Sequence, residues 1–297
     1  MRKEGAIRKV LEQLEKQGKL PLHVFLLDAD SFIETDERSI DTIFRQGRDY
    51  MSGNDLAGLA LRIDALIEDD STPLQKCIYV DYAAVQIDNW ITSKQWQLWL
   101  INGPGGLFRS EHLLVALRAM TPDFDTGDLQ ISVNLMKRGL RIGFLPDITV
   151  KTTVPATVSQ YFRQRRRWER GTIKVLWKDR SFYISSFLTC RILALLTIIH
   201  LSIYVGITYL AIAAILFHDA LAFIMAQIIL VGILWYGINI IKLYSNPKVR
   251  NNKVALKVPV WAMWNGVVWL FITSPARIFG YVDAVSQLWT EARNSNT

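Results

Sequence analysis

The stretch that decides the fold is Leu22-His23-Val24-Phe25-Leu26-Leu27-Asp28-Ala29-Asp30. Its first part is a continuous apolar run, which is the pattern of a short strand covered on both faces. The run ends abruptly at two aspartates, so both carboxylates are predicted to lie at the carboxyl end of a strand. In open α/β sheets that edge is where ligands bind. We therefore expect an α/β domain with a functional site around Asp28 and Asp30.

The sequence on either side of this strand predicts a mixture of helices and further strands. The first residues are rich in Lys and Glu, and their apolar residues recur at helical spacing, so an amphipathic helix is expected there. The expected elements are helices over 1–20, 36–46 and 123–136, strands over 77–85 and 141–146, and a glycine-rich loop at 102–106. This order is typical of an α/β domain.

Two long apolar runs occupy the last third of the chain. Residues 192–217 and 220–241 contain no Asp, Glu, Lys or Arg. Each run is longer than the ~20 residues that a helix needs to cross a bilayer. A buried helix hairpin of a soluble protein is the alternative, but it would need a very large core around it. Together with a third run over 258–279, these segments predict an α-helical transmembrane region.

The positive charge is concentrated just before the first of these runs. The chain carries a formal net charge of +7, and residues 137–180 hold twelve Lys or Arg against three acids. Such a block suits either a nucleic acid or a membrane surface. Its place beside a predicted span, and a basic loop at 242–257, follow the positive-inside rule. We expect a multi-pass protein of the inner or plasma membrane with a cytoplasmic catalytic part, and no nucleic-acid partner.

Three short motifs carry residues suited to chemistry on a phosphorylated substrate. Asp28 and Asp30 could hold a hard divalent cation, Mg²⁺ or Mn²⁺, that bridges phosphate oxygens, although a D-x-D pair also occurs in solvated loops. Asp128 follows Thr126-Gly127 at the start of a predicted helix. It could act as a base, or simply be an acid favoured by the helix dipole.

The third motif is Gln164-Arg165-Arg166-Arg167-Trp168. It offers cations for a diphosphate and an indole face for a sugar ring. The same residues suit an interfacial amphipathic helix, with snorkelling arginines and a tryptophan at the headgroup level. The two interpretations are compatible.

Taken in this order and followed by apolar runs, the D-A-D, T-G-D and Q-x-x-R-W motifs resemble those of the processive family-2 glycosyltransferases. That family includes cellulose, chitin, hyaluronan, poly-N-acetylglucosamine and alginate synthases, and the resemblance runs from Val24 onward. It implies a partial GT-A-type, Rossmann-like catalytic domain over 1–157, an interfacial helix region over 158–186 and transmembrane helices within 187–297. The implied reaction is inverting transfer of a sugar from a nucleotide-sugar, a UDP-sugar, to a growing polysaccharide.

The resemblance also implies a role for each motif. The D-x-D acids would bind the metal and the diphosphate, the T-G-D acid would be the catalytic base, and the Q-x-x-R-W residues would bind the diphosphate and the acceptor. The implied residues are Asp28 and Asp30 for the divalent cation, Asp128 for the base, Gln164 and Arg167 for the diphosphate, and Trp168, Asn102, Gly105 and Gly106 for the acceptor.

One departure from the family's pattern lies before Asp28. Family members begin their catalytic domain with a strand, a helix and a strand that hold the nucleobase, whereas only an amphipathic helix precedes the D-A-D strand here. We therefore expect a chain that lacks the N-terminal part of the domain. It is a C-terminal fragment, the product of a split or misassigned reading frame, or one half of a two-chain enzyme in which another chain supplies the missing half. The alternatives are a non-processive lipid glycosyltransferase, or a catalytically silent or partner-dependent membrane fragment. The expected partners are a nucleotide-sugar donor, a glycan acceptor and the lipid bilayer.

Overall fold

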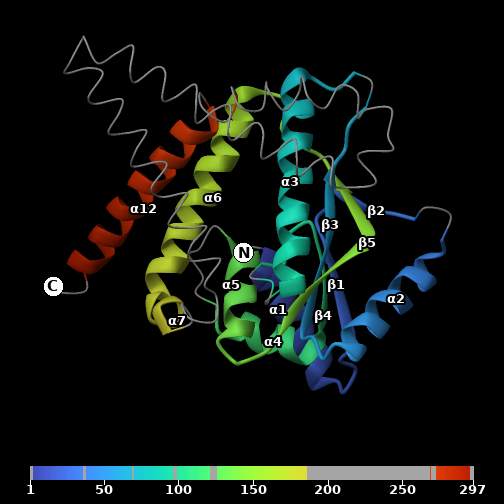
Figure 1. Ribbon diagram of the computed structural model, residues 1–297. Coiled ribbons are helices and arrows are strands. Elements are labelled where there is room, and N and C mark those ends of the chain that lie inside the picture. The colour runs from blue at the N-terminus through green and yellow to red at the C-terminus, as the bar shows by residue number, and fades with distance from the viewer. Residues whose placement is uncertain are drawn as a thin grey trace, which may run out of the picture.

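The computed structural model describes residues 3–35, 38–68, 70–95, 98, 100–120, 126–185, 268 and 272–294. This part of the chain is built on one mixed sheet with helices on both faces (Figure 1). The strand order is β1 (His23–Leu27), β4 (Gly105–Arg109), β3 (Gly58–Ala65), β5 (Ile142–Thr152) and β2 (Ser31–Glu34). Strands β3 and β5 are parallel, and the other neighbours are antiparallel. The α/β class is thus confirmed.

The D-A-D segment connects two strands that lie at opposite edges of this sheet. Among the strands that the structure describes, β1 pairs only with β4 and β2 pairs only with β5, yet three residues separate β1 from β2 in the sequence. The backbone N–H of Asp28 donates to the carbonyl of Pro104 before β4 (3.4 Å), and that of Thr153 after β5 donates to the carbonyl of Asp30 (3.2 Å). The segment therefore crosses one end of the sheet, tied at both sides.

The prediction that β1 is covered on both faces is confirmed, because Val24 and Leu26 pack against an apolar cluster on one face and Phe25 against a cluster on the other, but the cover is partial. Its side chains are half-buried rather than buried, Leu27 is 37% exposed, and Leu22 just before it is 77% exposed. Within the described part, β1 is an edge strand, so its side chains have neighbours on one flank only. An apolar run marks the strand correctly but does not tell an edge from a centre.

Helices cover the two faces of the sheet with separate apolar clusters. On one face, α2 (Ile40–Gly53) buries Ile43 and Met51 against strand residues such as Leu61 and Val150. On the other face lie α1 (Lys3–Lys16), α4 (Ser110–Arg118) and α5 (Gly127–Met136), packed on Phe108 and Phe144. The predicted N-terminal amphipathic helix is confirmed, and Leu11 anchors it in this second cluster.

Residues 77–85, predicted as a strand, belong to helix α3 (Pro73–Gln95). The start of this helix is fixed by a reciprocal cap, a Thr–x–x–Gln capping box. The Gln75 N–H donates to Thr72 Oγ1 (3.3 Å), and the Thr72 N–H donates to Gln75 Oε1 (2.9 Å). Pro73 suits the first helical position because that residue needs no hydrogen-bond donor. These start signals outweigh the apolar, partly β-branched run that follows.

A helical layer formed by α6 (Val158–Lys178) and α12 (Ser274–Asn294) stands beside α3 (Figure 1). A short helix, α7 (Arg180–Ser185), follows α6. The Arg166 guanidinium donates two hydrogen bonds to the Asp283 carboxylate (2.6 and 2.8 Å). The backbones approach closely at Gly280, where a Cβ would lie 2.5 Å from the Arg166 carbonyl oxygen. Residues far apart in the sequence are thereby fixed side by side.

Among the helices that the structure describes, none combines enough length and apolar character to cross a membrane. The predicted spans 192–217 and 220–241 lie outside the described residues. Of the third span, 258–279, the structure describes only residues 268 and 272–279, and α12 continues to Asn294. The transmembrane region stays a prediction.

The Gly280 contact can be tested by adding a methyl group. In Gly280→Ala the new Cβ meets backbone, which cannot rotate away, so we expect a loss of roughly 1–3 kcal/mol in the free energy of unfolding. Thermal unfolding of the detergent-solubilised chain measures it. The matched control is Gly53→Ala at the end of α2, where the new Cβ has no atom within 4 Å other than those of its chain neighbours and its own helix backbone. Equal melting temperatures for the two variants would contradict the α6–α12 packing.

Candidate active site

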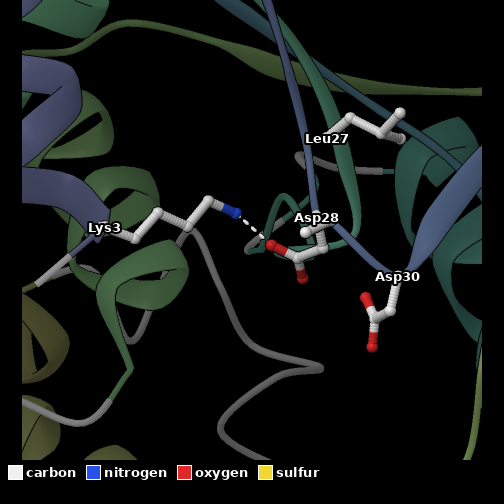
Figure 2. A pocket seen from close by; sticks show the side chains of 5 residues that line it. Lys3, Leu27, Asp28 and Asp30 are labelled. Atoms are coloured by element: carbon white, nitrogen blue, oxygen red, sulfur yellow. Dashed lines mark hydrogen bonds and ion pairs between the residues drawn. The ribbon is translucent and has the colours of Figure 1, made fainter.

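Asp28 and Asp30 line a pocket of about 680 Å³ at the end of the sheet. Figure 2 shows both carboxylates beside this space, with Lys3 reaching toward Asp28 from α1. Asp30 Oδ2 accepts a hydrogen bond from Thr153 Oγ1 (3.1 Å), which fixes the carboxylate beyond the end of β5. Asp28 forms an ion pair with Lys3. The D-A-D acids are therefore held by two different parts of the fold.

Asp28 and Asp128 meet at Gly103, in the loop before β4. The Gly103 N–H donates to Asp128 Oδ2 (3.0 Å). A Cβ at Gly103 would lie 3.4 Å from Asp128 Oδ2 and 3.7 Å from Asp28 Oδ2, so both carboxylates flank the same backbone position. Asp128 is in the first turn of α5, and its Oδ1 accepts the Leu129 N–H (2.9 Å). Two predicted site residues a hundred positions apart are thus brought together.

The surroundings of Asp128 favour its protonated form. Burial raises the pKa of this carboxyl above its usual value, and the nearby negative charges of Glu4 and Asp28 raise it further. The N–H groups of Leu129 and Gly103 act in the opposite direction but do not cancel the rise. A carboxyl with a raised pKa is better suited to accept a proton from a substrate at neutral pH.

Two residues of this site, Lys3 and Glu4, were not expected from the sequence. Both belong to the first turn of α1. Lys3 pairs with Asp28 and also approaches the carbonyl of Gly103 (3.4 Å). The Glu4 side chain lies over Gly127, where it fills the space that a Cβ would need. Their amphipathic helix gave no local signal of this role, because the contact depends on how α1 docks on α4 and α5.

Helix α6 packs closely against the T-G-D segment at Gly171. A Cβ at Gly171 would lie 2.6 Å from Thr126 Cγ2, and Val175 packs against Leu129. Gln164 and Trp168 precede Gly171 by seven and three positions, so they lie on the same face of the helix. The predicted Gln164 and Trp168 are therefore on the α6 face that meets the T-G-D segment.

The remaining Q-x-x-R-W residues differ in their surroundings. Gln164 Oε1 is buried and has no hydrogen-bond partner within the part of the chain that the structure describes. Arg167 is exposed to solvent. A buried amide oxygen without a partner is costly, so a hydrogen-bond donor placed beside it would be stabilising. The role of both residues in diphosphate binding stays a prediction.

Three of the four residues predicted to face the acceptor lie in or next to β4. Gly105 and Gly106 are buried within the strand, and Cβ atoms there would meet Val150 Cγ2 at 2.8 Å and Ile101 Cγ2 at 2.6 Å. Close packing is thus a sufficient reason for both glycines. Asn102 accepts the Gly105 N–H at its carbonyl (3.3 Å) and holds the turn that presents Gly103. Acceptor contact by these residues stays a prediction.

The carboxylates fit a cation that a substrate completes. Within the described ranges, no three or more His, Cys, Asp and Glu side chains are placed so that they could hold a metal ion, so a closed metal site made by this part alone is not found. Mg²⁺ and similar ions are often held by one or two carboxylates together with substrate phosphates and water. Asp28 and Asp30 match that smaller donor set.

Comparison with known families identifies the class of protein. The family described as "Glycosyl transferase family group 2" matches residues 23–238, more than half of the chain. The chain belongs to this glycosyltransferase family. The match begins at the first residue of β1 and includes all three motifs described above.

Among similar proteins are two N-acetylglucosaminyltransferases. The one from Rhizobium meliloti is 32% identical over 80 residues, which is 24% of this chain and 18% of the relative. The one from Bradyrhizobium diazoefficiens is 29% identical over 79 residues, which is 24% of this chain and 16% of the relative. The aligned part thus spans less than a fifth of these relatives. A mannosyltransferase from Pyrobaculum calidifontis, solved in complex with GDP-Man and Mn²⁺, has a TM-score of 0.45 and 16% identity over 88% of this chain and 66% of its own.

The raised pKa of Asp128 predicts a pH-dependent stability difference between Asp128→Asn and the wild type. Asparagine mimics the protonated carboxyl. Well below the unfolded-state pKa of about 3.9, the wild-type aspartate is protonated in both the folded and unfolded states and contributes no pH dependence. Above that pKa the unfolded state releases the proton first, so wild-type stability falls relative to the variant. Between pH 4 and pH 8, the melting temperature of Asp128→Asn minus that of the wild type should increase as pH rises. A difference that decreases with pH would contradict the assigned environment of Asp128.

Proposed function

We propose that the chain is the catalytic part of a membrane-associated, inverting glycosyltransferase of GT-A type that moves a sugar from a nucleotide-sugar, a UDP-sugar, to a growing polysaccharide. One observation carries the proposal: Asp128, with its raised pKa, lies beside Asp28 across Gly103. This arrangement joins a candidate base to a candidate diphosphate site. Family membership supplies the reaction class.

In the proposed reaction each carboxylate has a separate task. Asp28 and Asp30 would hold a divalent cation, Mg²⁺ or Mn²⁺, which when bound supplies positive charge for the leaving diphosphate. Asp128 takes the proton of the acceptor hydroxyl. The hydroxyl oxygen then forms a bond to the anomeric carbon as the bond to the diphosphate oxygen breaks, and the electron pair leaves with the diphosphate. Attack opposite the leaving group inverts the anomeric centre.

The face of α6 supplies the remaining proposed contacts. Gln164 and Arg167 would bind the diphosphate, since amide and guanidinium N–H groups donate to phosphate oxygens. Trp168 offers an aromatic face on which the acceptor sugar can stack. Docking of Gly171 on Thr126 supports this proposal, because it keeps this face beside Asp128. A growing chain held on Trp168 would permit repeated addition.

Exposed apolar residues on α12 support a bilayer as partner. Ile278, Tyr281, Val282, Val285 and Trp289 are all at least 38% exposed and recur at helical spacing. A stripe of exposed apolar side chains on a helix is typical of an interfacial segment. The adjacent α6 is rich in arginine, which anionic headgroups attract. Together with the apolar runs over 192–241, these features favour a membrane protein with its catalytic part on the cytoplasmic side.

The relatives suggest which donor to test first. Both are named N-acetylglucosaminyltransferases, so UDP-N-acetylglucosamine leads a panel of UDP- and GDP-sugars. The acceptor in the assay is an N-acetylglucosamine tetrasaccharide. Product size distinguishes a polysaccharide synthase from an enzyme that adds one sugar to a lipid.

The decisive experiment measures nucleoside diphosphate release by the solubilised chain with Mg²⁺ or Mn²⁺. We expect release with one donor, and a fall of roughly 10²–10⁴-fold in Asp128→Asn, because the variant has no base in place. Binding of the donor should change little. Undiminished release by Asp128→Asn would show that Asp128 is not the base, and no release with any donor would contradict the proposed function of this chain.

A second candidate function, a partner-dependent chain, is favoured by the position of α1. Lys3 neutralises Asp28, the carboxylate that would bind the cation, and Glu4 covers Gly127. Both contacts close the site from the side of α1. A partner that displaced the first turn of this helix would open the site.

This second candidate predicts tighter cation binding when Lys3 is removed. Lys3→Ala frees Asp28 from a competing positive charge, so the Mn²⁺ dissociation constant should fall several-fold. Isothermal titration calorimetry of the solubilised chain measures it without turnover. Lys9→Ala, an exposed change on the same helix, is the matched control and should bind Mn²⁺ as the wild type does. An unchanged dissociation constant in Lys3→Ala would show that α1 does not compete with the cation.

A further inference from the structure

A buried ion pair joins α3 to the Q-x-x-R-W motif. Asp81 of α3 pairs with Arg165 of α6, the residue directly after Gln164. Arg165 is 6% exposed, and 24% of the Asp81 side chain is exposed. Neither residue has a role in the proposed reaction. A buried guanidinium needs a partner because its desolvation is costly, and Asp81 is the carboxylate that provides it.

The Arg165 guanidinium lies against two aromatic rings of its own helix. Its carbon atom Cζ is 4.9 Å from the centroid of the Tyr161 ring and 4.7 Å from that of the Trp168 ring. These residues precede and follow it by four and three positions, so they are neighbours on the helix surface. A planar guanidinium stacks on aromatic faces, and its plane therefore restricts the ring of Trp168.

Tyr161, at the other end of this group of stacked side chains, is held in place as well. Tyr161 is buried, and its hydroxyl is 3.1 Å from the hydroxyl of Thr273, just before α12. The Trp168 ring thus continues a rigid series that begins at Thr273 and includes Tyr161 and Arg165. Asp81 is the one charged group from α3 that the structure pairs with this series in its described part.

Arg165 differs from the cations that could bind a diphosphate, because its charge is already neutralised. Arg165 already has its carboxylate and is buried, whereas Arg167 is exposed. An effect of Asp81 on catalysis should therefore pass through the Trp168 ring rather than through diphosphate binding.

We propose that Asp81 is a positioning residue for the acceptor sugar, because it holds Arg165 in the plane that orients the Trp168 ring. This inference rests on the proposed function, which places the acceptor sugar on Trp168. The orientation of one ring face sets the place of the acceptor hydroxyl relative to Asp128, and small misplacements of a reacting group lower the rate strongly.

The first test compares acceptor and donor kinetics in Asp81→Asn. Loss of the carboxylate charge releases Arg165, so we expect the KM for the N-acetylglucosamine tetrasaccharide to rise about tenfold, because the Trp168 ring holds the sugar less well. The kcat should fall as well, because the acceptor hydroxyl is misplaced relative to Asp128. The KM for the donor should stay within about twofold, since diphosphate contacts are untouched. Asp81→Glu keeps the charge and should restore most of the acceptor KM. Equal changes in both KM values would overturn the proposal.

A double-mutant cycle tests whether Asp81 acts through Trp168. If it does, the acceptor KM of the double variant Asp81→Asn/Trp168→Ala should equal that of Trp168→Ala alone, because the ring that Asp81 orients is already gone. If the double variant instead raises the acceptor KM by the product of the two single effects, Asp81 acts independently of Trp168, and the proposal is overturned.

Controls separate positioning from folding. Asp179→Asn breaks another partly buried ion pair, with Lys137, at the far end of α6, and it should lower the melting temperature without raising the acceptor KM. If Asp81→Asn does not fold, the pair is removed together as Asp81→Asn with Arg165→Met, which leaves no unpaired charge. That variant should still bind the acceptor more weakly, and wild-type affinity in it would overturn the proposal.

A binding measurement keeps this inference distinct from the proposed function. Calorimetric titration of the tetrasaccharide into the solubilised chain needs no turnover. Binding by the wild type that weakens about tenfold in Asp81→Asn, but not in Asp179→Asn, supports the role of Asp81. Wild-type binding that Asp81→Asn leaves unchanged overturns that role alone. A wild type that neither binds this acceptor nor releases nucleotide overturns the proposed function and the role of Asp81 with it.

Discussion

The hydrogen bond from the Gly103 N–H to Asp128 is the contact on which the candidate site depends. It joins the loop before β4 to the first turn of α5, and the same glycine lies against Asp28. Two carboxylates brought this close repel each other, and burial of Asp128 adds to the cost. The fold offsets that cost with backbone N–H groups and with the cation of Lys3. In the proposed function, a bound metal ion would offset that cost in the same way.

Close packing at two glycines fixes the positions of α6 and α12 relative to this site. Gly171 places α6 on Thr126, and Gly280 places α12 on the carbonyl of Arg166. A side chain at either position would move a helix by the size of a methyl group, because backbone and buried atoms leave no room. The position of the Q-x-x-R-W face therefore depends on glycines outside the motif as much as on the motif residues themselves. Asp81 adds the electrostatic part of the same positioning.

Asp28, Asp30 and Asp128 were singled out because an acid after an apolar strand or at a helix start has a readable context, and their roles were implied by the family resemblance. The structure brings Asp28 and Asp128 together at Gly103, while those roles stay a prediction. The strand Gly58–Ala65 was not expected, because Arg62 and Asp64 interrupt its apolar run and pair with each other inside the structure. Residues 77–85 look like a strand by composition, and only the Thr72–Gln75 cap reveals the helix. Lys3, Glu4 and Asp81 could not be found locally, since each acts on a segment distant in sequence.

The central claim is that Asp28 and Asp128 form one site across Gly103, and Gly103→Ala tests it most directly. The added Cβ would lie 3.4 and 3.7 Å from the two carboxylates, so the fold has room for it, while an apolar group would then stand where charge and substrate must meet. We predict a melting temperature close to that of the wild type and a fall of roughly 10²-fold or more in nucleoside diphosphate release. A folded Gly103→Ala variant with wild-type release would contradict the account.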